Sequence, residues 1–400
     1  MKKNIALKLL TSEAAPSKST NASPERIPLV FADMPPYEEL APAFREIIES
    51  RKVSNFGKYN QAFEGEATRL LGVPAVTVSS GTMGLLFALQ ALGVTSGDRV
   101  LVPSFTFMAT VQAILYCGAV PIFLEIGPDM TVSVEDLKEQ LAKNERVAAV
   151  IGVHTYGLPA RVEEIQRAVD QKNQDLQRKI KVIYDGAHAF GASVGKKRVG
   201  SFGDAEVFSL SVTKALVAIE GGMITSRHPE VIERIRKMRN YGIESNYNTF
   251  YPGLNGKMSE LHSVVGLHNL KNLDWVLAER KRKAQYYVHA IESVSGFRTI
   301  SVPSQVVHTY KDFTVFVPQA LQGKRDEVCR ELNAQGIDNR AYFYPAVHEQ
   351  EYFKGYHSRP LPVTEDLSRR CITLPFFTSM TEAQMERVAE ALSRSEKKLK

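Results

Sequence analysis

The sequence predicts an α/β protein with a mostly parallel sheet flanked by helices, arranged as a larger domain followed by a smaller one. Three observations support this. Strand-like and helix-like segments alternate through the middle of the chain, polar residues follow several of the strand-like segments, and 400 residues exceed one ordinary domain. Alternating strands and helices are typical of a parallel sheet that is covered on both faces.

The alternation is clearest between residues 120 and 172. Val120–Ile126 and Val147–His154 are largely apolar and are expected to be strands. Each is followed by a helical pattern, Val134–Lys143 and Val162–Lys172, with acidic residues near its start, where they favour the helix dipole. These four segments therefore predict two successive strand–helix units of one sheet.

The last third of the chain predicts a second, smaller α/β domain. A largely helical stretch from Met258 to about Val294 has no internal proline, and it is long enough to link two domains before Gly296 interrupts the pattern. Beyond it, the expected elements are a strand, His308–Val317, and two helices, Lys324–Gln335 and Thr381–Lys397. We therefore expect three parts: a poorly anchored extension (1–26), a large domain that includes an N-terminal arm and the linking helix (27–295), and a small domain (296–400).

The composition argues against several classes of protein. The net charge is +6, but the basic runs are short and indicate solvated faces more than a nucleic-acid surface. No run of about 18 apolar residues predicts a membrane span. The three cysteines, Cys117, Cys329 and Cys371, lie far apart, without the spacing of a disulfide framework or a metal site. We expect a cytoplasmic protein that binds no metal, nucleic acid or membrane.

Lys214 is the first candidate for chemistry. It carries the one ammonium group in a run, Phe208–Gly222, that is nearly all small or apolar. Burial of a charge without a partner is costly, so a desolvated lysine tends to lose its proton and become a nucleophile that can form a Schiff base.

Asp185 is the second candidate, because it follows the expected strand Lys181–Tyr184. A carboxylate at the carboxyl end of a parallel strand lies where α/β proteins build their sites, and it could hold the protonated pyridine nitrogen of pyridoxal 5'-phosphate (PLP). The alternative is an aspartate that caps the next turn. His188 could contact the ring oxygen of the cofactor, or it could be an ordinary buried histidine.

Two further segments follow strands. Ser79–Gly84 precedes a helix, and small hydroxylated residues with glycine at a helix N-terminus offer N–H groups to a phosphate. The alternative is a helix cap, which also favours serine and threonine. Phe107 follows the strand Arg99–Val102, and it could stack on a flat ring or belong to the core.

Together these segments resemble one family. SSGT, PSFTF, DGAHAFG and FSLSVTK followed by EGGMI occur in the order found in DegT/DnrJ-type nucleotide-sugar aminotransferases, which are PLP enzymes of the aspartate aminotransferase fold type I. The resemblance runs from about Ile27 to about Glu390. It includes the stretches MPPYEEL (34–40), NFGK (55–58), GVHTYG (152–157) and GLNGKMSE (253–260).

The resemblance implies a role for each site residue. Lys214 would carry the cofactor through a Schiff base and shuttle protons, Asp185 would pair with the pyridinium nitrogen, and His188 would lie near the ring hydroxyl, where the family often has glutamine. The phosphate would be bound by Gly81, Thr82 and Ser209, and Phe107 would stack on the ring. Asn255 would reach the phosphate in the neighbouring subunit, so that a homodimer would share its active sites. Plausible substrate contacts in the small domain are Arg340, Tyr342, Tyr344 and His348; surface packing is the alternative for these four.

The implied reaction is transamination of a keto sugar on a nucleotide diphosphate, with glutamate as the amino donor. The stretch from Thr213 to Gly222 resembles members that act at carbon 4, which favours dTDP-4-keto-6-deoxy-hexose as the substrate. The alternatives are amination at carbon 3, another nucleotide sugar, or a PLP-binding regulator without turnover. Related sugar dehydratases replace the lysine with histidine, so Lys214 argues against dehydration.

Overall fold

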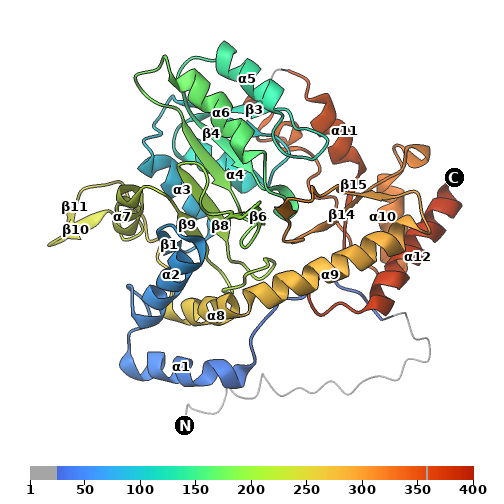
Figure 1. Ribbon diagram of the computed structural model, residues 1–400, viewed down its shortest axis with the longest axis horizontal. Helices are drawn as coiled ribbons and strands as arrows, with labels where there is room; N and C mark the ends of the chain where they lie inside the picture. The colour runs from blue at the N-terminus through green and yellow to red at the C-terminus, as the bar shows by residue number, and fades with distance from the viewer. Residues whose placement is uncertain (1–24, 357–358) are drawn as a thin grey trace, which may run out of the picture.

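The computed structural model describes residues 25–356 and 359–400 of the chain. At the centre of this described part lies a seven-stranded sheet with the strand order β1-β9-β8-β5-β4-β2-β3 (Figure 1). Its strands are β1 (Ala75–Val78), β2 (Arg99–Pro103), β3 (Val120–Leu124), β4 (Val147–Val153), β5 (Lys181–Asp185), β8 (Ala205–Ser209) and β9 (Gly222–Thr225).

The central sheet is mixed but mostly parallel, as predicted. The neighbouring pairs from β3 through β2, β4 and β5 to β8 are all parallel. β9 runs antiparallel to both β8 and β1, and its first residue, Gly222, lies opposite Val78 and Ser209. The carboxyl ends of β1, β5 and β8 therefore meet at one edge of the sheet.

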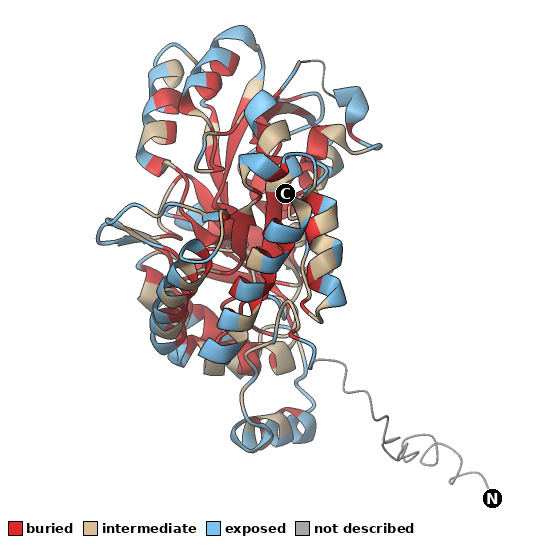
Figure 2. Ribbon diagram, turned by 90° about the vertical axis from the view of Figure 1, so that its right-hand side faces the viewer, coloured by how far each residue is buried: buried red, intermediate tan, exposed pale blue. Residues whose placement is uncertain are grey.

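Helices cover both faces of this sheet, and the sheet is the most deeply buried part of the molecule (Figure 2). Alternate residues of β2 point to opposite faces: Val100 and Val102 pack in one apolar cluster and Leu101 in another. The first cluster includes α3 (Gly81–Ala91), α4 (Met108–Tyr116) and α7 (Pro229–Met238), and the second includes α5 (Val134–Lys143) and α6 (Val162–Asn173). The helix α2 (Lys58–Leu71) packs against α8 (Glu260–Lys271).

The C-terminal part has its own sheet and core. The strands β12 (Arg298–Thr299), β14 (Phe313–Phe316) and β15 (Cys371–Leu374) pair antiparallel. The core around them is formed with α9 (Leu273–Glu292), α10 (Arg325–Ala334) and α12 (Glu382–Leu399). Ile27 is also buried in this core, and its backbone pairs with Ile337. The division at residues 26 and 295 remains a prediction, and the extension falls mostly in residues 1–24, outside the described residues.

Two predicted elements differ from the structure. The stretch Met258–Val294 forms two helices, α8 and α9, that meet at Asn272. The strand predicted at His308–Val317 is confined to Phe313–Phe316 because Tyr310 adopts a positive φ of 50° and its N–H donates to His308 Nδ1 at 2.6 Å. This local turn interrupts the extended backbone, so the strand begins only at Phe313.

The remaining elements lie at the periphery. The helix α1 (Tyr37–Ser50) and the hairpin β10 (Ile243–Ser245) and β11 (Asn248–Thr249) project from the body (Figure 1). α11 (Pro362–Arg370) precedes β15, and the short strands β6 (Ser193–Val194), β7 (Lys197–Arg198) and β13 (Val306–Val307) form a small sheet. No helix in the described ranges is long and apolar enough to cross a membrane.

Candidate active site

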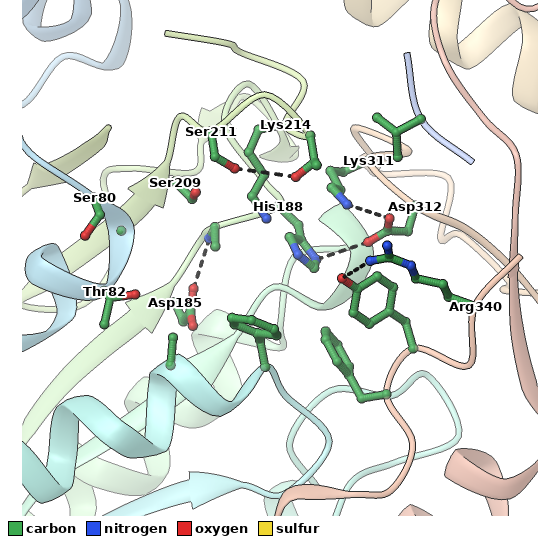
Figure 3. A pocket seen from close by; sticks show the side chains of 18 of the residues that line it. Ser80, Thr82, Asp185, His188, Ser209, Ser211, Lys214, Lys311, Asp312 and Arg340 are labelled. Carbon is green, nitrogen blue, oxygen red and sulfur yellow. Dashed lines mark hydrogen bonds and ion pairs between the residues drawn. The ribbon is translucent and has the colours of Figure 1, made fainter. Parts of the chain in front are cut away.

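A cavity of about 540 Å³ lies where the carboxyl ends of β5 and β8 face segments of the C-terminal part (Figure 3). Asp185 ends β5 and Ser209 ends β8, so the parallel strands bring both to the same edge. Many of the residues singled out from the sequence line this cavity together: Gly81, Thr82, Phe107, Asp185, His188, Ser209, Lys214, Arg340 and Tyr342.

One wall of the cavity is the N-terminus of α3. Ser80 caps the helix, since its hydroxyl accepts from the Met83 N–H at 3.2 Å. The N–H groups of Gly81 and Thr82 in the first turn have no partner within the helix and lie at its positive end. Thr82, Ser209, Ser211 and Thr213 contribute further hydroxyl groups to the lining of the same cavity. The arrangement provides the donors that a phosphate group requires.

Asp185 is held in a single orientation at the base of the cavity. Thr110 donates from Oγ1 to Asp185 Oδ2 at 2.7 Å, and the Ala187 N–H donates to Oδ1 at 3.0 Å. Thr106 lies 2.8 Å from the Thr110 hydroxyl and extends the network. Because each oxygen accepts one bond, the carboxylate is oriented yet keeps lone pairs for a ligand.

Lys214 lies in the loop between β8 and β9, and its side chain points into the cavity (Figure 3). Burial lowers the pKa of Lys214 to about 8, and the positive charge of Lys311 acts in the same direction. A lysine with this pKa has a substantial neutral fraction near neutral pH, and the neutral amine is the nucleophilic form.

Aromatic rings also line the cavity. Phe107, the residue before α4, is 44% exposed and lines the cavity. His188 stacks on Phe343 with ring centroids 6.2 Å apart and planes within 12°. Burial lowers the pKa of His188 well below its usual value, and the charges of Lys214 and Lys311 add to this effect. The imidazole is therefore neutral at neutral pH.

These residues fit PLP. The donors at α3 suit its phosphate, the fixed Asp185 carboxylate suits a protonated ring nitrogen, and Lys214 suits an aldehyde. The glycines allow the close packing that this requires: a Cβ on Gly81 would lie 3.0 Å from the Ser209 Cβ, and one on Gly222 would lie 2.5 Å from the Ser80 carbonyl.

Three residues singled out from the sequence do not line the cavity. His348 is buried, with Nδ1 at 2.5 Å from the Ser104 hydroxyl. Tyr344 packs under the Arg325 guanidinium at 4.1 Å. Asn255 is exposed, and its backbone pairs with Asn240 near the projecting hairpin. None of the three contacts the site within this subunit, so their predicted roles stay predictions.

Sequence reasoning missed several cavity residues. Ser211 and Thr213 precede Lys214 in the same segment and could have been found from its hydroxyl spacing. Lys311 and Asp312 form a charged pair immediately before an apolar strand, which was a detectable signal. No signal in the sequence identifies the roles of Thr110 and Phe343, because only the tertiary structure brings Thr110 to Asp185 and Phe343 to His188.

Comparison with known proteins supports the same chemistry. Residues 37–393 match the family model of the DegT/DnrJ/EryC1/StrS aminotransferase family. The chain is 33% identical over 85% of its length to the UDP-N-acetyl-3-dehydro-alpha-D-glucosamine 3-aminotransferase of Acidithiobacillus ferrooxidans, 89% of which is covered. It is 29% identical over 92% of its length to the dTDP-4-amino-4,6-dideoxy-D-glucose transaminase of Escherichia coli, 98% of which is covered.

A solved structure agrees with the fold. The crystal structure of DesI with its TDP-sugar product superposes with a TM-score of 0.85 at 30% identity, covering 93% of each chain. The predicted fold type and cofactor dependence are thereby confirmed. With its ordered motifs, its lysine and aspartate at one cavity and a family match over most of its length, the chain belongs to the DegT/DnrJ/EryC1/StrS family of PLP-dependent nucleotide-sugar aminotransferases.

Proposed function

We propose that the enzyme transfers an amino group from glutamate to carbon 4 of a dTDP-4-keto-6-deoxy-hexose. The observation that carries the reaction class is Lys214, with its lowered pKa, pointing into a cavity that also holds the fixed Asp185 carboxylate. The segment from Thr213 to Gly222 and the Escherichia coli transaminase favour position 4.

The cavity residues have different roles in the proposed reaction. When bound, PLP supplies the electron sink that amino transfer requires. Asp185 keeps a ring nitrogen protonated, with Thr110 preventing its carboxylate from turning away. Lys214 takes and returns protons at the carbon that gains or loses the amino group, because its pKa of about 8 suits both directions near neutral pH.

Arg340 and Tyr342 are proposed to hold the anionic part of the substrates. Arg340 is exposed at the cavity, and its Nη1 lies 3.4 Å from the Tyr342 hydroxyl. A guanidinium suits both a diphosphate and a carboxylate, because its planar fork can donate two hydrogen bonds at once. One cavity could therefore accept the nucleotide sugar and the amino donor in turn.

Amination at carbon 3 is the second candidate. It is favoured by the relative from Acidithiobacillus ferrooxidans, a 3-aminotransferase that is 33% identical to this chain. The two candidates differ in which sugar carbon faces the lysine, and the two relatives are also named for different nucleotides.

The test is a substrate panel with the purified holoenzyme. dTDP-, GDP- and UDP-linked 4-keto and 3-keto sugars would each be incubated with glutamate or another amino acid, with Lys214→Ala as the inactive control. NMR of the product locates the new C–N bond. We expect a 4-amino sugar from the dTDP-linked 4-keto substrate with glutamate. A 3-amino product, or turnover only with another nucleotide, would contradict the assignment.

A further inference from the structure

The carboxylate of Asp312 is the most unusual charged group at the cavity. It is almost fully buried, and Oδ1 accepts from Lys311 Nζ at 2.6 Å. The other oxygen, Oδ2, is buried and has no hydrogen-bond partner among the described residues. An ionised oxygen that is buried without a donor is costly, so this position indicates a partner close by.

The candidate for this partner is His188. Its Nδ1 lies 3.7 Å from Asp312 Oδ2, slightly beyond hydrogen-bond distance, and the imidazole faces the carboxylate (Figure 3). Asp312 immediately precedes β14 of the C-terminal sheet, whereas His188 follows β5 of the central sheet. The contact therefore joins the two parts of the molecule at the cavity.

Two other contacts from the C-terminal part hold His188. The Thr309 hydroxyl donates to the His188 carbonyl at 2.6 Å, and the Phe343 ring stacks on the imidazole. The backbone and one ring face are thus fixed, and rotation of the ring is the freedom that remains. A carboxylate at Nδ1 would remove that freedom.

Direct substrate binding by Asp312 fits the structure less well. The side chain is 4% exposed and Oδ2 is covered, so a sugar in the cavity would not reach the free oxygen. The charged and titratable groups that act on His188 are Lys214, Lys311, His308 and Asp312. Of these groups, only Asp312 has a carboxylate, which can accept a hydrogen bond from an N–H of the imidazole.

We propose that Asp312, neutralised by Lys311, is a positioning residue that accepts a hydrogen bond from His188 Nδ1–H and so determines which ring nitrogen His188 turns toward the cofactor. The proposal rests on the aminotransferase site described above and adds a residue from outside the central sheet to it. The carboxylate–imidazole pair fixes the tautomer and the orientation of the ring, as such pairs do in other sites.

The direct test observes the tautomer in the apoprotein, without any sugar substrate. In ¹⁵N-histidine NMR, the resonance lost in His188→Gln identifies His188. We expect the Nδ1–H form in the wild type. In Asp312→Asn the form should shift toward Nε2–H, because the new amide can donate to Nδ1, and Asp312→Glu should retain Nδ1–H. Asp338→Asn is the control, since this cavity-lining carboxylate pairs with Arg26 instead and should leave His188 unchanged. An Nε2–H form in the wild type, or an unchanged form in Asp312→Asn, would overturn the proposal.

A second test uses the holoenzyme and separates positioning from general charge effects. Asp312→Asn should weaken PLP binding about tenfold, the equivalent of one charge-assisted hydrogen bond. In a His188→Gln background the same change should have a much smaller effect, because the residue that it positions is already gone. Equal effects in both backgrounds would overturn the proposal. Thermal unfolding checks that each variant is folded, and Asp312→Glu provides a carboxylate-bearing variant if Asp312→Asn is unstable.

Discussion

Two lysines of the described chain line the cavity, and their surroundings separate their roles. Lys311 forms an ion pair with the adjacent carboxylate of Asp312 at 2.6 Å. Lys214 instead has its pKa lowered to about 8, first by burial and then by the charge of Lys311. At the scale of single residues, the environment therefore decides which lysine reacts: Lys214 is desolvated and forms no ion pair among the described residues, so it is the nucleophile.

This difference predicts a pH dependence for cofactor uptake by the apoprotein. Only the neutral amine attacks an aldehyde, so below pH 7 the rate of PLP attachment should rise about tenfold per pH unit. It should level off above a midpoint near pH 8, because the pKa of Lys214 is lowered to about 8 from 10.5. The rise of the lysine-bound absorbance band measures this rate, with Nα-acetyl-lysine as the reference.

Two checks accompany the pH profile. Lys311→Met should move the midpoint upward, since it removes a neighbouring positive charge. Borohydride reduction followed by peptide mass spectrometry should locate the label on Lys214. A rate that continues to rise beyond pH 10, or a label on Lys311, would show that the nucleophile has been assigned to the wrong lysine.

At the scale of elements, the phosphate site depends on how closely β9 approaches the start of α3. Gly222 opens β9 and lies opposite Val78 and Ser209. A Cβ on Gly222 would lie 2.5 Å from the carbonyl carbon and oxygen of Ser80 and 2.7 Å from the Gly81 nitrogen. These are backbone atoms that cannot rotate away, so the strand and the helix would have to separate.

We expect Gly222→Ala to weaken PLP binding by at least about tenfold and to destabilise the fold by roughly 1–3 kcal/mol, as overpacking does. Equilibrium dialysis and thermal unfolding measure the two effects. The matched control is Gly65→Ala in α2, where no atom lies within 4 Å of the added Cβ. This control should be neutral or slightly stabilising, because alanine favours a helix. Wild-type PLP affinity in Gly222→Ala would mean that the helix start is not the phosphate site.

At the scale of the whole molecule, one residue predicted to bind the cofactor, Asn255, lies away from the cavity of its own subunit. Asn255 is exposed and does not line the cavity of its own chain. It lies near a projecting hairpin with exposed apolar side chains at Tyr247, Phe250 and Leu254. Exposed apolar groups of this kind are typical of interfaces, so we propose a homodimer in which Asn255 completes the partner's site.

Complementation between inactive variants tests the shared site. In a mixed dimer of Lys214→Ala and Asn255→Ala, one site has both residues and the other has neither. Random exchange should restore activity to about a quarter of the wild type, because half of the dimers are mixed and each has one intact site.

The control for complementation mixes Lys214→Ala with Asp185→Asn. Both residues belong to one chain's cavity, so every mixed site keeps one lesion and no activity should return. Native mass spectrometry verifies exchange in both mixtures. If the Asn255→Ala mixture stays inactive after verified exchange, the site lies within one chain and Asn255 has a local structural role.

The sequence by itself determined the local elements and the residues at their ends. The helices Val134–Lys143 and Val162–Asn173 and the strand before Asp185 follow from apolar periodicity, which depends on neighbouring residues only. Because sites of α/β proteins lie at the carboxyl ends of parallel strands, Asp185 could be placed at the site without coordinates, whereas Ser209 was placed there only by the family resemblance. The family was also readable, since its motifs are short, contiguous and ordered.

Only the tertiary structure decided what surrounds those residues. Thr110 reaches Asp185 across 75 positions of sequence, and the partners of His188, namely Thr309, Asp312 and Phe343, come from the far end of the chain. His348 is buried against Ser104 in this subunit, a placement that its sequence context did not indicate, and its predicted role at the substrate stays a prediction. Such contacts form when two sheets with separate cores close on one cavity, and their geometry depends on packing over the whole molecule. A local pattern therefore identifies the reactive group, while the residues that orient it and set its pKa are determined by the folded chain.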